Sequence, residues 1–305
     1  MYKSWFNHEG DILYTKNGYD IILCKICGFK HIIPIPDEPE LTQIYKEDYY
    51  SVEKPLYIER MEKDKEWWDL VYSDRYDIFE QYLDSEKRSI LDVGSGTGYF
   101  LLYGKKRGWI TQGIEPSRQA ANYSKNILGL NIIEDFLNEK TSKTLPKFDV
   151  IHMSEVLEHI SDPGQLLKIT TSLLKYNGIL CISVPNDSNP IQLALEKIDN
   201  FSPWWFAPPH HINYFDFKSL RTFISKMNYE VILEEATFPI DLFLLMGDNY
   251  IDNDQLGREC HQKRINIEKK LNLAGLNNLK RQLYQKFAEL GIGREVVLFA
   301  RNNNA

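Results

Sequence analysis

The sequence lacks long apolar runs, is poor in cysteine and carries no excess of positive charge. It contains no stretch of about 18 consecutive apolar residues, so no transmembrane helix is predicted. The opening residues, MYKSWFNHEGDILY, lack the basic and then apolar layout of a signal peptide. The 4 cysteines among 305 residues are too few for a disulfide framework. We therefore expect a protein of the reducing cytoplasm without a membrane span.

The charge balance is acidic, with a net charge of −7. Nucleic-acid binding proteins normally carry a basic face, so we expect no nucleic-acid partner. With 43% hydrophobic and 26% charged residues, the composition is that of an ordinary globular protein. The length of 305 residues suffices for one catalytic domain with an appendage or a large insertion.

Residue patterns divide the chain into three parts. Residues 1–55 combine short β-like runs with a Cys-x-x-Cys pair and several prolines, which predicts a small knuckle-like segment. Residues 56–88 show helical spacing of apolar side chains and are expected to form a lid or connector. Residues 89–305 form the expected catalytic domain, with a helical insertion over about 241–291. An insertion of that size covers a substrate, a partner chain or the sheet edge, and an exposed apolar stripe on it would favour a homodimer.

From Ser89 onward, short apolar runs alternate with helical patterns. Such alternation predicts an α/β fold with a mostly parallel sheet covered on both faces. Two later β-like runs, near 230–233 and 296–299, predict an antiparallel pair at the sheet edge. The expected parallel strands cover residues 89–93, 131–133, 148–153 and 179–184, and a further one ends at 113–115.

A glycine-rich turn follows the first strand of the alternating region, in Asp92-Val93-Gly94-Ser95-Gly96-Thr97-Gly98. Glycines at alternate positions let the chain turn tightly and bring its backbone against a ligand. The spacing is GxGxG, whereas dinucleotide-binding folds use GxGxxG to hold a pyrophosphate. Asp92 would also repel a pyrophosphate, because its carboxylate precedes the turn.

Glu115 ends the next expected strand, about twenty residues after the glycines. An acidic side chain at that place can accept hydrogen bonds from both hydroxyls of a ribose. Alone it would be read as a solvated loop residue, but together with the glycine turn it favours a nucleoside ligand.

Four segments in order, ILDVGSGTGYF, GIEPS, FDVIHMSEVLEHISDP and LLKYNGILCISVPN, resemble the successive motifs of class I S-adenosylmethionine-dependent methyltransferases. The resemblance implies a Rossmann-like seven-stranded sheet, mostly parallel with an antiparallel edge strand, and S-adenosylmethionine as cofactor. It implies roles for residues in each segment. Asp92, Gly94, Gly96 and Gly98 would contact the methionine portion of the cofactor, and Glu115 would bind the ribose. Asp135 and Phe136 would contact the adenine, with Glu134 competing for the acidic role. Ser154 and Glu155 would lie beside the sulfonium.

A further segment, PPHHINYFDFKSLRTFISKMNYEV, resembles a subgroup that includes sugar and quinone methyltransferases. The resemblance makes His210 or His211 the candidate general base, because a hydroxyl acceptor must lose its proton and histidine titrates in the useful range. The alternative is that these histidines only satisfy loop backbone groups. His159 is expected either to shape the site or to cap its loop.

Cys24-x-x-Cys27 is half of a zinc-ribbon knuckle. Methyltransferases of sugars that resemble this chain often begin with two such pairs, but here the upstream pair is absent. His8 and His31 flank the knuckle and are the expected remaining ligands of a structural zinc ion. The alternative is a metal-free remnant with two small buried cysteines.

We therefore expect methyl transfer from S-adenosylmethionine to an oxygen of a small molecule, a nucleotide-linked or lipid-linked sugar or other glycan precursor. Aromatic residues near the expected site suit a ring-shaped acceptor, although ordinary packing would also explain them. These residues are Tyr45, Tyr49, Tyr50, Trp204, Trp205 and Phe206. Two alternatives are an NAD-dependent sugar dehydrogenase or epimerase and a non-catalytic partner subunit that binds the cofactor.

Overall fold

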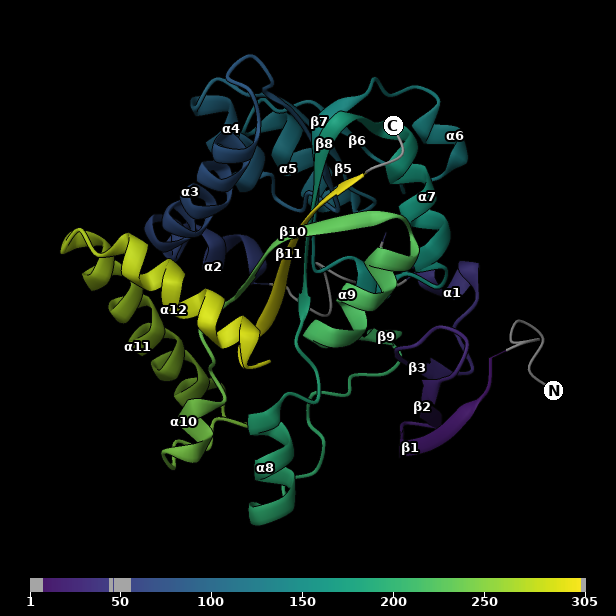
Figure 1. Cartoon of the computed structure of the whole chain (residues 1–305), viewed down its shortest axis with the longest axis vertical. Helices are drawn as coiled ribbons and strands as arrows, with labels where there is room; N and C mark the ends of the chain where they lie inside the picture. Colours follow the sequence, from purple (N-terminus) through teal and green to yellow (C-terminus); the bar gives the residue numbers. More distant parts are fainter. Residues whose placement is uncertain (1–7, 44–45, 47–55, 303–305) are drawn as a thin grey trace.

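The computed structural model describes residues 8–43, 46 and 56–302. Its strands form two sheets, and helices surround the larger one (Figure 1). None of the helices in these ranges is both long and apolar enough to cross a membrane.

The larger sheet has seven strands in the spatial order β10-β11-β8-β7-β4-β5-β6. These are β4 (Ser89–Val93), β5 (Ile110–Ile114), β6 (Ile132–Ile133), β7 (Phe148–Ser154), β8 (Leu174–Pro185), β10 (Tyr229–Ala236) and β11 (Glu295–Asn302). Strands β4 to β8 run parallel to one another. Strand β11 runs antiparallel to both β8 and β10, so the reversed strand lies one place inside the edge. The expected Rossmann-like, mostly parallel seven-stranded sheet is confirmed.

Helices cover both faces of this sheet, as alternating strand and helix patterns require. One core contains buried side chains of α7 (Pro163–Leu173), α9 (Phe217–Lys226) and α12 (Asn277–Glu289). The other contains side chains of α2 (Tyr57–Lys63), α3 (Lys65–Tyr82), α4 (Tyr99–Lys106) and α5 (Arg118–Asn126). Asp162, Asn189 and Asp216 each cap the helix that follows, since their side chains accept a backbone N–H of its first turn.

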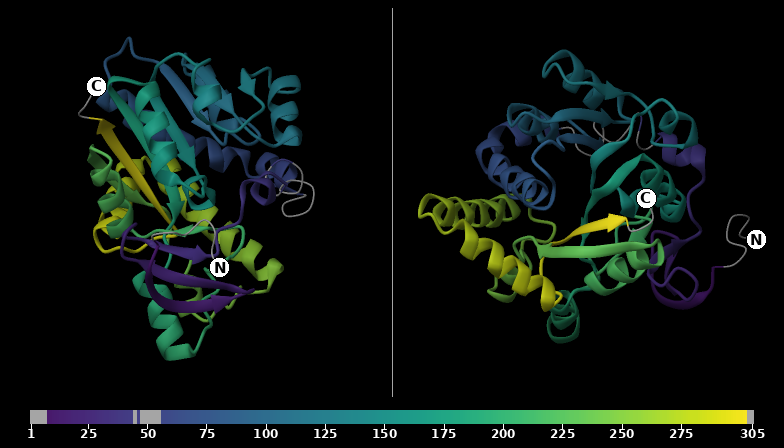
Figure 2. Two further views of the ribbon diagram at one scale, coloured as in Figure 1. Left: turned by 90° about the vertical axis from the view of Figure 1, so that its right-hand side faces the viewer. Right: turned by 45° about the horizontal axis from the view of Figure 1, so that its top comes forward.

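The smaller sheet contains four strands in the order β1-β2-β3-β9. Three come from the N-terminal segment, namely β1 (Gly10–Lys16), β2 (Tyr19–Cys24) and β3 (Lys30–Ile33). The fourth, β9 (Asn213–Tyr214), comes from the segment between α8 (Pro190–Asp199) and α9. The two views of Figure 2 show this sheet beside one end of the larger one. The N-terminal segment is therefore joined to the main domain by a strand from far along the chain.

The remaining helices are α1 (Glu38–Gln43), α6 (Glu139–Ser142), α10 (Leu242–Leu245), α11 (Asp254–Leu273) and the one-turn 3-10 helix η2 (Leu157–His159). Helices α10, α11 and α12 occupy the stretch between β10 and β11 for which the sequence predicts a helical insertion. In Figure 1 they lie together along one side of the molecule, next to α2 and α3.

Candidate active site

A cavity of about 600 Å³ opens where the parallel strands β4, β5 and β7 end. This is the edge at which parallel α/β sheets bind ligands, and the volume suits a small organic molecule. Its lining includes eight of the nine residues that the resemblance assigns to the cofactor: Asp92, Gly94, Gly96, Glu115, Asp135, Phe136, Ser154 and Glu155.

The glycine turn leaves β4 with a left-handed backbone. The φ angles of Gly94 and Gly98 are 70° and 81°, a region that side chains disfavour. A Cβ atom on Gly94 would lie 2.7 Å from a methyl carbon of Val156. A Cβ atom on Gly98 would lie 2.6 Å from a methyl carbon of Leu130, so Gly98 allows helix packing and is not itself part of the cavity lining.

Glu115 joins the glycine turn to the start of α5. One carboxylate oxygen accepts the Gly96 N–H at 2.8 Å and the other accepts the Ser117 N–H at 2.9 Å. Burial raises the pKa of Glu115 to about 7, and nearby Asp92 adds to the increase, whereas the two backbone hydrogen bonds oppose it. Each carboxylate oxygen keeps a second lone pair, with which it could accept a ribose hydroxyl.

Asp92 is held by a buried chain of hydrogen bonds. His152 Nδ1 lies 2.7 Å from an Asp92 carboxylate oxygen, and His152 Nε2 lies 2.7 Å from Arg75 Nη1. Because arginine only donates, Nε2 must accept and Nδ1 must carry the proton, so the imidazole is neutral. Burial lowers the pKa of His152 and agrees with that state. Arg75, on α3, thus brings a positive charge to the cofactor end of the cavity.

Asp135 and Phe136 lie at the far end of the cofactor side. Lys46 lies 3.7 Å from the Asp135 carboxylate and 5.4 Å from the centre of the Phe136 ring. Glu134, the competing acidic residue, instead forms ion pairs with Arg118 and Lys125 at 3.6 Å and does not line the cavity. The geometry favours Asp135 over Glu134 for contact with a ligand.

The end of β7 brings two further polar residues to the cavity. Ser154 is its last residue, and Glu155 follows with a φ angle of 53°. A left-handed glutamate is uncommon and marks a backbone that its surroundings hold in place. The Glu155 N–H donates to the carbonyl oxygen of Ser183 at 2.8 Å, which fixes this turn against β8.

The opposite wall of the cavity comes from later parts of the chain, namely Thr237, Arg264 and Glu295. Arg264 reaches it from α11, with its Cζ 4.7 Å from the centre of the Trp67 ring and its Nε donating to Glu268 at 3.4 Å. The Glu295 carboxylate accepts the Ser183 hydroxyl at 3.1 Å. Burial and the charge of Glu155 raise the pKa of Glu295, while Arg264 and Arg75 oppose the increase.

A glutamate and two histidines meet beside this wall. The ligating atoms of Glu158, His159 and His211 lie within 4.8 Å of one another. Within the described ranges neither carboxylate oxygen of Glu158 makes a hydrogen bond, and the residue is 1% exposed. Burial raises its pKa well above the usual range, and Glu155 adds to this. We call these three residues the Glu-His-His cluster; they can bind a proton or a divalent cation.

His210 and His211, the two candidates for the general base, lie next to His159. His159 lines the cavity, whereas the described lining contains neither His210 nor His211. His210 contributes its carbonyl oxygen, 2.7 Å from His159 Nδ1. The His211 ring meets the His159 ring edge-on at a centroid distance of 4.9 Å. Of these three histidines, His159, whose role the sequence leaves open, is therefore the one that faces the cavity.

Comparison with known proteins decides the family. A family model described as "Methyltransferase domain" matches residues 65–234, more than half of the chain. The chain belongs to the class I S-adenosylmethionine-dependent methyltransferases.

Curated relatives match part of this methyltransferase. It is 34% identical to the ubiquinone biosynthesis O-methyltransferase of Histophilus somni (strain 2336) over 154 residues, covering 43% of this chain and 64% of that protein. A protein of the same name from Coxiella burnetii is 29% identical over 137 residues, covering 40% of this chain and 58% of its own. The matches thus span less than two thirds of these relatives.

Solved methyltransferases share the fold. The plantazolicin methyltransferase BpumL, in complex with S-adenosylhomocysteine (SAH), has a TM-score of 0.52 and 14% identity, covering 87% of this chain and 94% of its own. The magnesium protoporphyrin IX methyltransferase of Synechocystis PCC 6803, with bound SAH, has a TM-score of 0.50 and 11% identity, covering 88% of this chain and 100% of its own. At these identities the likeness concerns the fold alone.

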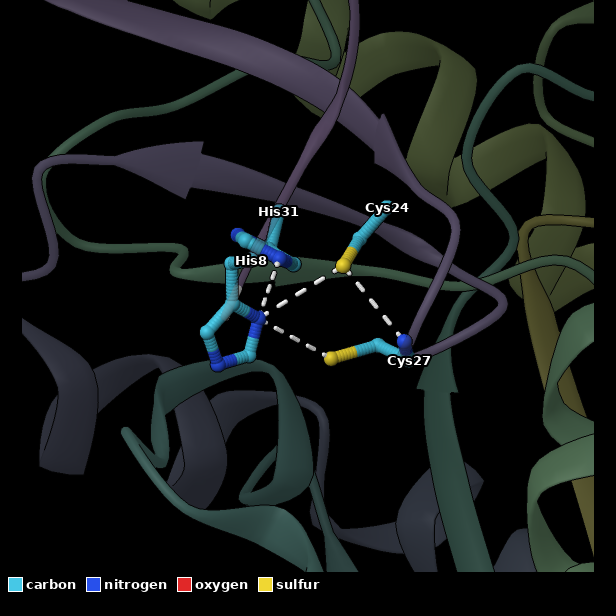
Figure 3. Close-up of side chains that lie close together, drawn as sticks. All are labelled: His8, Cys24, Cys27 and His31. Atoms are coloured by element: carbon cyan, nitrogen blue, oxygen red, sulfur yellow. Dashed lines mark hydrogen bonds between the residues drawn. The ribbon is translucent and has the colours of Figure 1, made fainter. Parts of the chain in front are cut away.

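The methyltransferase has a second polar centre in the smaller sheet, where His8, Cys24, Cys27 and His31 point toward one another (Figure 3). His8 Nδ1 lies 3.2 Å from His31 Nε2, 3.5 Å from Cys24 Sγ and 3.3 Å from Cys27 Sγ. Ligands of one tetrahedral zinc ion are separated by roughly 3.3–3.8 Å, given the usual Zn–N and Zn–S lengths. The four residues therefore have the donor types and spacing of a Cys2His2 zinc site.

The predicted aromatic wall of the site is only partly described. Tyr45, Tyr49 and Tyr50 lie outside the described residues. Trp205 and Phe206 are buried in the core of the smaller sheet with Ile21 and Ile32, and Trp204 packs against that core. These three aromatic residues serve packing in this methyltransferase.

Proposed function

We propose that this protein transfers the methyl group of S-adenosylmethionine to an oxygen of a ring-shaped small molecule. The proposal rests on one continuous cavity with two differently lined sides. One side is lined by the glycine turn, Asp92 and Glu115. The other side is lined by Arg264, Glu295 and His159. The first group has the residue types that bind a nucleoside with a charged amino-acid tail. The second leaves room for an acceptor beside it.

The chain's residues would mainly position the two reactants. Bound S-adenosylmethionine would supply the methyl group, which the acceptor oxygen would take from the sulfur as the carbon–sulfur bond breaks, with SAH as the other product. Arg75 would pair with the cofactor's carboxylate, and Glu115 would accept the ribose hydroxyls. The acceptor hydroxyl must also lose a proton, which the Glu-His-His cluster would accept. A divalent cation held by the same three side chains would polarise the hydroxyl instead.

The chemical class of the acceptor is a finer proposal. The histidine segment resembles sugar and quinone methyltransferases, and together with the N-terminal knuckle this resemblance favours a sugar or glycan precursor, linked to a nucleotide or a lipid. The names of the curated relatives favour a phenolic hydroxyl of a quinone precursor. Both acceptors are rings with neighbouring hydroxyl groups, so screening should begin with matched catechols and sugars.

The alternatives receive less support from the site. A dehydrogenase or epimerase would place a pyrophosphate at the glycine turn, where the buried Asp92 carboxylate repels it. A non-catalytic partner subunit would not need a cavity that continues past the cofactor residues to Arg264 and Glu295.

We also propose a structural zinc ion at His8, Cys24, Cys27 and His31. The smaller sheet buries few residues of its own, and small cores are often stabilised by a metal. The exposed leucines of the insertion lead us to propose a homodimer as well.

Titration calorimetry with SAH and, separately, with NAD tests the proposed function. We expect micromolar binding of SAH, loss of that binding in Glu115→Ala, and no binding of NAD. Glu134→Ala is the matched control, because Glu134 is a nearby acidic residue whose carboxylate faces away from the cavity. Binding of NAD without binding of SAH would overturn the methyltransferase proposal.

A further inference from the structure

The Cys2His2 centre and the Glu-His-His cluster are joined by a short run of backbone hydrogen bonds. The Ile32 N–H, next to the ligand His31, donates to the carbonyl oxygen of Ile212 at 3.0 Å. The Ile212 N–H in turn donates to the carbonyl oxygen of Glu158 at 2.7 Å. Ile212 is therefore bonded on one side to the strand that carries His31 and on the other to the turn that carries Glu158.

A second connection runs through the neighbouring residue. His31 pairs directly with Asn213 in the β3–β9 ladder. The buried Asn213 side chain donates to the carbonyl oxygens of Leu157 at 3.0 Å and Ile160 at 2.7 Å. These two bonds lie on either side of Glu158 and His159, so Asn213 fixes both ends of their turn.

The knuckle also packs against the main core. Phe29 lies between Cys27 and His31 in sequence, and its ring centre is 4.8 Å from that of Phe215 and 5.2 Å from that of Phe223. The cofactor residues Asp92, Gly94 and Glu115 belong instead to β4, β5 and their loops in the larger sheet. Through Phe29 the knuckle thus packs against Phe215, which follows β9, and against α9.

We propose that the metal bound by His8, Cys24, Cys27 and His31 positions the Glu-His-His cluster for reaction with the acceptor. This inference rests on the proposed function, which assigns the Glu-His-His cluster to the reaction of the acceptor. The bound metal clamps the β2–β3 turn, which holds β3 against β9 and keeps Glu158, His159 and His211 in register. Loss of the metal releases that ladder, while the cofactor side retains its shape. His8 and His31 are positioning residues in this arrangement.

Variants of His8 provide the sharpest test, because His8 is half-buried and lies outside the strands. His8→Ala removes one ligand, and His8→Cys restores a Cys3His set that also binds zinc. Cys260→Ala, in α11, controls for a cysteine lost away from the centre. The measurements are zinc content, SAH affinity and hydrogen–deuterium exchange, and none of them requires a known acceptor.

We expect one zinc ion per chain in the unaltered protein, in His8→Cys and in Cys260→Ala. In His8→Ala, and in the unaltered protein after chelation, peptides covering 157–160 and 210–214 should exchange about tenfold faster. Peptides covering 94–98 and 113–117 should be unchanged, and the SAH dissociation constant should stay within about twofold.

Three results would overturn the inference. The first is that the protein binds no zinc. The second is that exchange at 157–160 and 210–214 does not change after zinc removal. The third is that zinc removal abolishes both SAH binding and protection from exchange throughout the chain. The last result would make the metal a global stabiliser. A zinc-loaded protein that shows the expected exchange but fails to bind SAH would instead contradict the proposed function and leave the coupling intact.

Discussion

Glu115 is a carboxyl group that must be ionised to serve as a double acceptor, yet its burial favours the protonated form. Its pKa is raised to about 7, with Asp92 the neighbouring charge that adds to the effect of burial. Protonation therefore increases as the pH falls through 7. We predict that SAH binds about tenfold more weakly at pH 6 than at pH 8, since one pKa unit corresponds to a tenfold change in the ionised fraction.

Calorimetric dissociation constants at the two pH values measure this effect. Glu115→Gln cannot titrate, so its affinity for SAH should be weak and nearly independent of pH. If the SAH affinity of Glu115→Gln still changed with pH, the pH dependence would belong to another group.

Residues that follow the ends of strands could be predicted from the sequence, and residues that meet across the fold could not. Asp92, Gly94 and Glu115 sit in local patterns that fix their places at the sheet edge. His152 occupies the middle of an apolar strand and reads as a core residue. Its pairing with Asp92 depends on the register of β4 against β7. Arg75 reaches the same chain from α3, and no local pattern indicates where that helix packs.

Helix α11 places Arg264 at the end of the cavity that we propose for the acceptor, and the arginine is 8% exposed. The Arg264 guanidinium lies over the Trp67 ring, and its Nε donates a hydrogen bond to Glu268. These two contacts hold the guanidinium in one orientation. We predict that Arg264→Gln raises the KM for the acceptor about tenfold or more, as loss of a hydrogen bond from a charged donor implies. The SAH dissociation constant should not change.

Steady-state kinetics with the first acceptor found by screening measure this effect. Lys270→Gln removes an exposed positive charge from the same helix and is the matched control. Equal KM values for Arg264→Gln and the unaltered protein would show that the insertion does not contact the acceptor.

At the scale of elements, the strands of the larger sheet were predicted, whereas β1 and β9 of the smaller sheet were missed. The seven strands of the larger sheet contain apolar runs, which the sequence shows directly, and β4, β7 and most of β8 and β11 are buried. Strand β1 is largely exposed and lacks a clear alternation. Strand β9 has two residues and is defined only by pairing with β3, about 180 residues earlier. The extent of the smaller sheet, and its connection to the Glu-His-His cluster, therefore required the structure.

On the scale of the whole molecule, the insertion presents a row of leucines to solvent. Leu279 and Leu283 of α12 are 44% and 42% exposed, and Leu276 and Leu290 beside them are 43% and 64% exposed. The steps of three, four and seven residues place them on one stripe, as at the seam of paired helices. Because a second copy of the chain carries the same stripe, the simplest partner is that second copy, in an isologous dimer.

We predict that the unaltered protein has twice its chain mass of 35.8 kDa in size-exclusion chromatography with light scattering. Leu279→Glu combined with Leu283→Glu should give the monomer mass, because two charges would be buried at the seam without partners. Leu193→Glu, at an exposed leucine of α8, should leave the dimer intact. A monomer mass for the unaltered protein would leave the leucine row to another role. The SAH affinity of the monomeric variant then decides whether the dimer matters for the cofactor site, since α12 contributes no residue to the cavity lining within the described ranges.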